Sequence, residues 1–268
     1  MHFRNIYKKR EAEHLIFSIN RASLEFYDSN TYAFFNNIIK QIQECDNIRH
    51  YEPDSISQEA PFIQGDKKGN GTPDILFEGD DFILGIEDFE FDASKKTKKG
   101  SKLRIAELNA KEQLRQNRLS TTTKPTTVEA LVDVNFSYED YVNSLLIAFK
   151  NHAKNINSYR ESIKRLYPSK KHIFLAFYIE DITAIGNYIA TPEGTKAMCP
   201  IFIKDFLDTL SHTSGLDYII ACVQDTYTYT IHFIKNSSVN LSELYKKAYD
   251  PEKDKFISYH YKKTQRIY

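Results

Sequence analysis

The sequence predicts an α/β protein in which a mixed central β-sheet is flanked by helices. Segments of helical period alternate along the chain with short apolar segments typical of buried strands. Of the 268 residues, 41% are hydrophobic, which is enough for a substantial core. We expect one domain over residues 1–268, with a helical N-terminal part (1–50) and a basic segment (93–127) that has the composition of a mobile loop.

The helical N-terminal part carries apolar stripes between residues 11 and 45, and Asp28-Ser29-Asn30 between them is either a break or an N-cap. A hairpin follows, with a strand at Asp74–Phe77, a turn at Glu78-Gly79-Asp80-Asp81 and a second strand from Phe82 to Phe91. Further helices are expected at 102–118, 138–166 and 201–210, and further strands at 173–179, 218–223 and 226–234. The last strand alternates apolar and polar residues, as a half-exposed strand does.

Several classes of protein are disfavoured by the composition. No apolar stretch approaches the about 18 residues of a transmembrane helix, and the N-terminus lacks the apolar core of a signal peptide. Three cysteines that lie far apart do not form a disulfide framework or a zinc ribbon, which favours a reducing interior. We therefore expect a cytoplasmic protein without a membrane partner.

The net charge of zero hides a strong asymmetry. Residues 52–92 carry a net charge of −10, and the adjoining residues 93–127 carry a net charge of +8. The two blocks are either solvated surfaces that partly neutralise each other, or a carboxylate metal site beside a phosphate-binding surface.

Two carboxylates of the hairpin have an informative spacing. Asp74 opens the first strand, and Glu87 interrupts the apolar second strand. A turn centred on Gly79-Asp80 places the two side chains one diagonal step apart, whereas an Asp80-Asp81 loop places them directly opposite each other. Both registers put them on one face of the sheet, with Cβ atoms about 4.5–8 Å apart. Two hard oxygen ligands at this spacing suit Mg²⁺, together with waters and a substrate phosphate.

These residues resemble the PD-(D/E)xK nuclease superfamily, which has the restriction-endonuclease-like fold. Its motif is Pro-Asp at the start of one strand, followed on the next strand by an acid, any residue and a lysine. Pro73-Asp74 matches the first half, and Ile86-Glu87 supplies the acid. The resemblance is close over 62–91 and covers 24–223 only as an order of elements. It implies a restriction-endonuclease-like core with Asp74 and Glu87 as ligands of Mg²⁺ or Mn²⁺.

The sequence departs from this motif at the lysine, where it has Phe89. Three explanations are open. The lysine has moved, as in some members of the superfamily, and we expect Lys99 or Lys102 to take its part in catalysis. Alternatively, Asp88 and Glu90 act on the other face of the sheet, which requires a hairpin loop of odd length to bring the first aspartate to their side. In the third explanation the site is inactive.

We expect a metal-dependent nuclease that hydrolyses DNA phosphodiester bonds, of a restriction or phage-defence type and, by analogy, a homodimer. Lysines of the basic segment and of the 138–166 helix are expected to contact the phosphates: Lys95, Lys96, Lys98, Lys150 and Lys154. The alternative is a catalytically silent relative that binds nucleic acid or a protein partner, which Phe89 and the zero net charge favour. An interaction scaffold without any nucleic acid is a third class.

Overall fold

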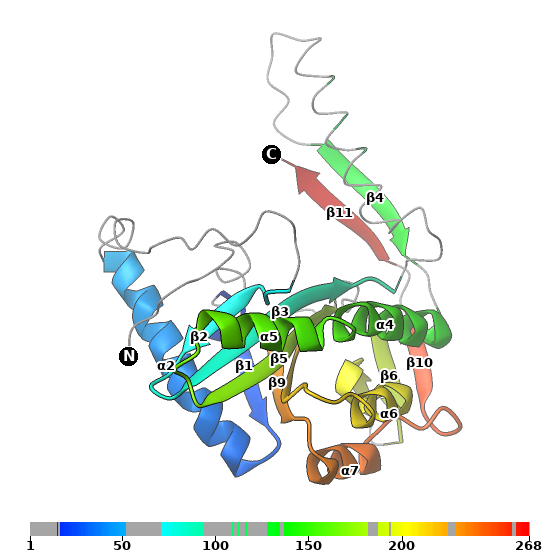
Figure 1. Ribbon diagram of the computed structural model, residues 1–268. Helices are drawn as coiled ribbons and strands as arrows, with labels where there is room; N and C mark the ends of the chain where they lie inside the picture. Colours follow the sequence, from blue (N-terminus) through cyan, green and yellow to red (C-terminus); the bar gives the residue numbers. More distant parts are fainter. Residues whose placement is uncertain are drawn as a thin grey trace.

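The fold is described from a computed structural model of the chain. The described residues are 15, 17–51, 71–93, 109, 112, 116, 128–134, 137–181, 187–192, 194–224, 229–258 and 261–267. A six-stranded mixed sheet lies at the centre, with the strand order β1-β9-β8-β5-β3-β2 (Figure 1). Its strands are β1 (Ala22–Phe26), β2 (Ile75–Glu78), β3 (Phe82–Phe91), β5 (His172–Asp181), β8 (Tyr218–Gln224) and β9 (Tyr229–Lys235).

The described residues also form two smaller sheets. The strands β10 (Lys255–Ser258), β6 (Asn187–Thr191) and β7 (Gly194–Ala197) make a three-stranded sheet, and β4 (Val128–Val134) pairs with β11 (Tyr261–Ile267). The helices are α2 (Ser29–Tyr51), α4 (Tyr138–Ala153), α5 (Ile156–Leu166), α6 (Lys204–Ser211) and α7 (Ser238–Lys246), with a short 3-10 turn η1 (Pro200–Phe202).

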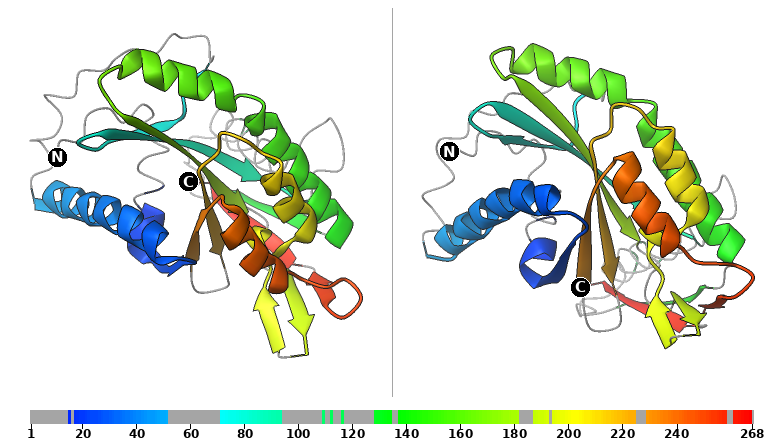
Figure 2. Two further views of the ribbon diagram at one scale, coloured as in Figure 1. Left: turned by 60° about the horizontal axis from the view of Figure 1, so that its bottom comes forward. Right: turned by 90° about the horizontal axis from the view of Figure 1, so that it is seen from below.

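The helices cover both faces of the six-stranded sheet. Figure 2 shows α2 on one face and α4, α5, α6 and α7 on the other. Each face therefore has its own apolar core, one formed with residues of α2 and the other formed mainly with residues of α4, α6 and α7. The predicted fold class, a mixed central sheet flanked by helices, is confirmed.

The predicted hairpin and the three strands that follow it are present. The strand β3 pairs antiparallel with β2 and parallel with β5, and β5 pairs parallel with β8. The helices α4 and α5 lie in the long connection between β3 and β5, as expected of a parallel pair.

Two helix predictions are wrong in part. The predicted helix at 11–45 is interrupted by the edge strand β1, because Ala22, Leu24 and Phe26 alternate with exposed residues and pair parallel with β9. The second helix of that region, α2, begins after Asp28, which accepts hydrogen bonds from the backbone and hydroxyl of Thr31 and is therefore an N-cap. The predicted helix at 138–166 is divided into α4 and α5 by a turn at residues 154–155.

The strand predicted at 226–234 is also more buried than expected. It is β9, which lies between β1 and β8 rather than at an edge, and Ile231, His232, Phe233 and Ile234 are all buried. Helices pack on both faces of the sheet, so alternation does not mean exposure here. Of the helix predicted at 102–118, only residues 109, 112 and 116 are described, and all three are helical.

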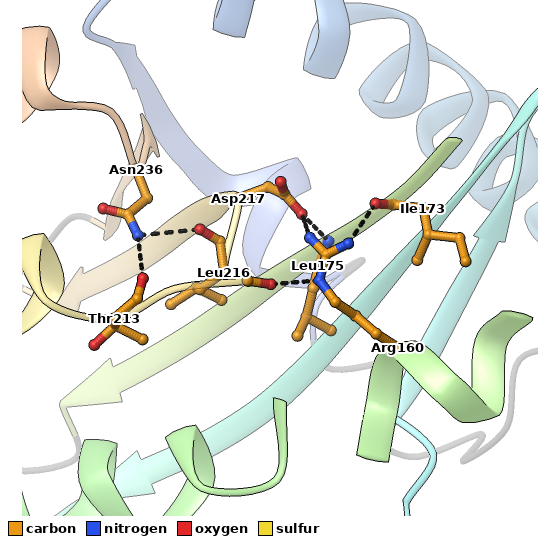
Figure 3. A network of polar contacts seen from close by, with 8 residues as sticks. Arg160, Ile173, Leu175, Thr213, Leu216, Asp217 and Asn236 are labelled. Atoms are coloured by element: carbon orange, nitrogen blue, oxygen red, sulfur yellow. Dashed lines mark hydrogen bonds and ion pairs between the residues drawn. The ribbon is translucent and has the colours of Figure 1, made fainter. Parts of the chain in front are cut away.

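A polar network holds α5 against the sheet (Figure 3). The guanidinium of Arg160 donates to the carbonyls of Gly215 at 2.6 Å and of Ile173 at 3.1 Å, and to the carboxylate of Asp217. The same carboxylate accepts from the backbone of Leu175 in β5 at 2.8 Å. Because Arg160 follows Tyr159 in α5, this network also fixes the position of Tyr159. No helix in the described part of the chain has the length and hydropathy to cross a membrane.

Candidate active site

Asp74 directly precedes β2, and the register of the hairpin brings it next to Glu87 of β3. Ile75 pairs with Ile86, and continuing this antiparallel register by one residue places Asp74 across from Glu87. The hairpin loop is the two residues 80–81, closed by a 2.9 Å hydrogen bond from the amide of Gly79 to the carbonyl of Phe82. Of the two registers expected from the sequence, this is the direct one. Both side chains are buried, with 8% of Asp74 and 7% of Glu87 exposed.

The even length of this loop decides between two predictions. Because side chains alternate along a strand, Asp74 shares the face of Glu87, which is the face covered by α5. Asp88 and Glu90 alternate to the opposite face, so the odd-length loop that their pairing with Asp74 requires is not formed. The alternative in which Asp88 and Glu90 act with Asp74 is therefore wrong.

Lys170 holds the turn of the hairpin from outside. Its ammonium lies 2.9 Å from the carboxylate of Glu78 and donates to the carbonyls of Gly79 at 2.6 Å and Asp80 at 3.1 Å. One cation therefore neutralises an acid of β2 and satisfies two carbonyls that the tight loop leaves outside the ladder.

Two glycines allow the segment before β2 to dock between β3 and α5. A Cβ on Gly85 would lie 2.8 Å from Cγ of Pro73, so Pro73 packs on the bare backbone of β3. Gly71 has a φ of 101°, and a Cβ there would lie 3.1 Å from the hydroxyl of Ser162 in α5. The two contacts fix the chain at Gly71 and at Pro73 and so place Asp74 just before β2.

The carboxylate of Glu87 has partners on both helices above it. Its Oε1 lies 2.7 Å from Nδ1 of His152, near the end of α4. Burial raises the pKa of the Tyr159 hydroxyl on α5, and the charge of Glu87 and a hydrogen bond to it raise that pKa further. The charge of Asp74 raises the same pKa, so the phenol lies close to both acids. Asp74 Oδ2 accepts a 3.1 Å hydrogen bond from the backbone of Asp88.

The residue at the motif's lysine position belongs to the core. Phe89 is 4% exposed and shares the face of Glu87. Its ring is stacked on the imidazole of His152, with centroids 4.6 Å apart and planes at 13°, and it meets Phe177 edge to face. The imidazole of His152 therefore lies next to both Glu87 and Phe89.

The lysines expected at the site divide into two groups. Lys95, Lys96, Lys98, Lys99 and Lys102 lie outside the described residues, so their predicted roles stay predictions. Lys150 and Lys154 are described; both are exposed at the end of α4 that carries His152. Their predicted contact with nucleic acid also stays a prediction.

The donor chemistry of the acidic pair fits a hard divalent cation. Asp74 and Glu87 offer carboxylate oxygens on one face, and burial of two adjacent carboxylates is costly unless positive charge or protons compensate it. In the described part of the chain, no group of three or more His, Cys, Asp and Glu side chains could hold a metal ion. Two carboxylates suit Mg²⁺, which commonly takes one or two carboxylates and completes its shell with waters and phosphate oxygens.

Sequence reasoning missed His152 and Tyr159. The histidine falls on the apolar side of its helix, seven residues after Leu145, and this position is more typical of a core residue. Only the long-range contact with Glu87, 65 residues away, distinguishes it. No known protein family, curated protein or solved structure matches this chain.

Proposed function

We propose that this protein is a metal-dependent nuclease that hydrolyses phosphodiester bonds of DNA, with Asp74 and Glu87 as the ligands of Mg²⁺ or Mn²⁺. One observation carries the proposal: two buried carboxylates lie opposite each other across a hairpin, on the face that bears the imidazole of His152. The resemblance of Pro73-Asp74 and Glu87 to the superfamily motif supports it.

A bound Mg²⁺ would lower the pKa of a water molecule and offset negative charge on the phosphodiester. The residues of the protein have other roles in the proposed reaction. Asp74 and Glu87 would hold the cation, and Tyr159 would keep the carboxylate of Glu87 oriented through its hydrogen bond. Lys150 and Lys154 would attract the DNA backbone to the end of α4.

The proposal is tested by cleavage of supercoiled plasmid and of single-stranded DNA in Mg²⁺, Mn²⁺ or EDTA. We expect cleavage that requires a metal and that Asp74→Asn and Glu87→Gln abolish, because each substitution removes one anionic ligand. Asp80→Asn is the matched control: it changes an exposed acid of the same hairpin and should leave the rate unchanged. Metal-dependent cleavage that persists in Asp74→Asn would contradict the assignment.

A catalytically silent relative is the second candidate. It is favoured by Phe89, which fills the lysine position with a buried ring. Such a protein would bind DNA or a protein partner equally well in EDTA and in Mg²⁺, and its DNA affinity would fall with salt as phosphate contacts require. Folded wild-type protein that binds DNA in a salt-dependent way and never cleaves it would favour this candidate.

We also propose that the protein is cytoplasmic, where it would meet its DNA substrate. Cys199 and Cys222 are free and buried, as is usual for thiols in a reducing compartment. That the enzyme acts as a homodimer stays a prediction, and sedimentation of the full chain with and without DNA would test it.

A further inference from the structure

The outer surface of α4 and α5 is strongly basic, although the whole chain has a net charge of zero. Residues 150–171 contain seven lysines and arginines and one acid, Glu161. Two of the seven bases are used inside the fold, in ion pairs with Asp217 and Glu78. The other five are exposed to solvent, as the acid is: Lys150, Lys154, Lys164, Arg165 and Lys171.

These five exposed bases are available to an anion from solvent. Within the described residues none of them forms an ion pair, and the ammonium of Lys154 donates a 3.2 Å hydrogen bond to the neutral side chain of Asn151. Two exposed lysines later in the chain are paired instead. Lys246 lies 2.5 Å from the carboxylate of Glu243, and Lys253 lies 3.3 Å from that of Asp250. The bases of α4 and α5 can therefore bind an anion without giving up a carboxylate partner.

The basic surface lies on both sides of the acidic pair. His152 near the end of α4 and Tyr159 in α5 both contact Glu87, so the turn that joins the two helices lies next to the pair. Figure 2 shows α4 and α5 following one another along one face of the sheet. The bases of α4 therefore lie before this turn, and the bases of α5, in its last turn, lie beyond it.

The same surface offers no aromatic ring on which a base could stack. All residues of α4 and α5 are described, and their four phenylalanine and tyrosine side chains are buried or half-buried. Proteins that bind single-stranded nucleic acid usually stack its bases on exposed rings. The remaining exposed side chains are mainly amides and a hydroxyl, which can donate to phosphate oxygens: Asn143, Asn151, Asn155, Asn157 and Ser158. This composition suits a phosphate backbone whose bases are already paired.

We propose that the outer surface of α4 and α5 binds the sugar–phosphate backbone of double-stranded DNA without stacking on its bases; this rests on the proposed function in taking DNA as the partner. The 11 residues of α5 extend over about 16 Å, which is the length of about five phosphates along one strand. Such contacts are electrostatic, so the affinity depends strongly on salt and little on base sequence. A duplex bound there has its backbone next to the acidic pair.

The test measures binding of the full chain to a short fluorescent DNA duplex in EDTA, over a range of salt concentrations. Lys164→Gln together with Arg165→Gln should bind the duplex more weakly. The slope of log K against log salt concentration should become shallower by about 2, because two phosphate contacts are lost. Glu161→Gln removes the acid between the bases, so it should bind the duplex more tightly than the wild type. All three side chains are exposed, and circular dichroism checks that the variants are folded.

The matched control is Lys246→Gln together with Lys253→Gln, which also removes two exposed positive charges. Figure 2 shows α7, which carries Lys246, beyond α6 from α4, so this variant should keep the salt slope of the wild type. A single strand of the same sequence should bind the wild type more weakly than the duplex does. Tighter binding of the single strand would overturn the proposal, and so would equal salt slopes for the wild type and the Lys164/Arg165 variant.

Binding and cleavage together distinguish this proposal from the nuclease function. If the wild type binds the duplex as expected and does not cleave it in Mg²⁺ or Mn²⁺, the nuclease function fails and the binding surface stands. If the wild type cleaves DNA and the Lys164/Arg165 variant keeps the wild-type salt slope, only the binding surface is overturned. If both proposals hold, this variant should have a higher KM for plasmid DNA and an unchanged kcat, because its metal ligands are intact.

Discussion

Phe89 and His152 lie face to face, with their ring centroids 4.6 Å apart and their planes inclined by 13°. The phenylalanine that departs from the nuclease motif is thus the support on which an imidazole rests beside Glu87. A lysine at this position would have to leave the core to reach solvent, because the position is 4% exposed and also contacts Phe177. Phe89 and His152 therefore belong to one arrangement beside Glu87.

This relationship predicts a specific effect of Phe89→Leu. Leucine keeps most of the apolar volume but removes the flat ring, so we expect a loss of about 1–2 kcal/mol in the free energy of unfolding. Under the proposed nuclease function we also expect slower cleavage, because the imidazole that contacts Glu87 is no longer held in place. Phe91→Leu is the control, since Phe91 is buried on the same face and packs on Tyr141. Urea unfolding should show similar losses for both variants, and equal cleavage rates would contradict the prediction.

Two tyrosine–aspartate pairs differ mainly in burial and predict different costs of removing a hydroxyl. Tyr141 donates to Asp181 at 2.6 Å inside the core, and Tyr245 donates to Asp208 at 2.5 Å on the surface. Burial and the charge of Asp181 raise the pKa of Tyr141 well above its usual value, so it stays a donor at any ordinary pH.

Tyr141→Phe should lower the free energy of unfolding by about 1–3 kcal/mol, because it removes a hydrogen bond from a carboxylate that is 3% exposed. Tyr245→Phe should change it by about 0.5 kcal/mol or less, since water replaces the lost partner. Urea unfolding of both variants at neutral pH measures the difference. Equal effects would mean that burial does not set the strength of these pairs.

The sequence predicts the part of the site that depends on residues close together in the chain. The hairpin, its acidic turn and the shared face of Asp74 and Glu87 all follow from the alternation of side chains over fourteen residues. The actual register needed the structure, since a turn at 79–80 and a loop of 80–81 both fit the sequence. His152 could not be predicted, because its spacing in α4 resembles that of a core residue and its partner is distant along the chain.

The same limit explains the elements that were missed. The strand β1 has only five residues and pairs with β9, about two hundred residues later. The alternation of apolar and polar residues in β1 is too short to be recognised between the two helical stripes that flank it. The burial of β9 likewise depends on β1 covering what would otherwise be an edge. Parallel pairing between strands that lie far apart in the sequence cannot be predicted from a local pattern of residues.

The close contacts of Gly85 predict the effect of adding a methyl group beside the segment that precedes β2. A Cβ at this position would lie 2.8 Å from Cγ of Pro73 and 2.8 Å from Cδ1 of Ile163. The isoleucine terminus can move, but the proline ring moves only with its backbone, which carries Asp74. Gly85→Ala should therefore lower the free energy of unfolding by about 1–3 kcal/mol and also reduce cleavage.

Leu76→Ala is the matched comparison for Gly85→Ala. Leu76 pairs with Gly85 across the hairpin and is buried with Ile163, so its truncation removes volume at the same place instead of adding it. We expect a loss of about 2–4 kcal/mol in unfolding free energy and an unchanged rate for the folded protein. Cleavage by Gly85→Ala at the wild-type rate would show that Pro73 accommodates the methyl group without moving Asp74.

The burial of His232 leads us to predict that the free energy of unfolding decreases in acid. It is 8% exposed on β9, and burial lowers its pKa from the usual value to about 4. Its Nδ1 lies 3.0 Å from the hydroxyl of Tyr27, and the ring of Phe202 packs against it. Two charged groups lie on neighbouring elements: the exposed Glu25, at the paired position on β1, and Lys247, which lies over the Tyr27 ring.

Between pH 6.5 and pH 4 the unfolded chain therefore binds a proton at His232 that the folded protein does not, so stability falls as the pH is lowered through this window. The expected loss is about 3 kcal/mol. His232→Gln keeps an acceptor for the Tyr27 hydroxyl and cannot be protonated, so the difference between wild type and variant should shrink by that amount from pH 7 to pH 4. The measurement is urea unfolding across this range, with His212→Gln as the exposed control. A difference in unfolding free energy that stays constant from pH 7 to pH 4 would contradict the prediction, because it would show that His232 binds its proton equally well in the folded and unfolded states.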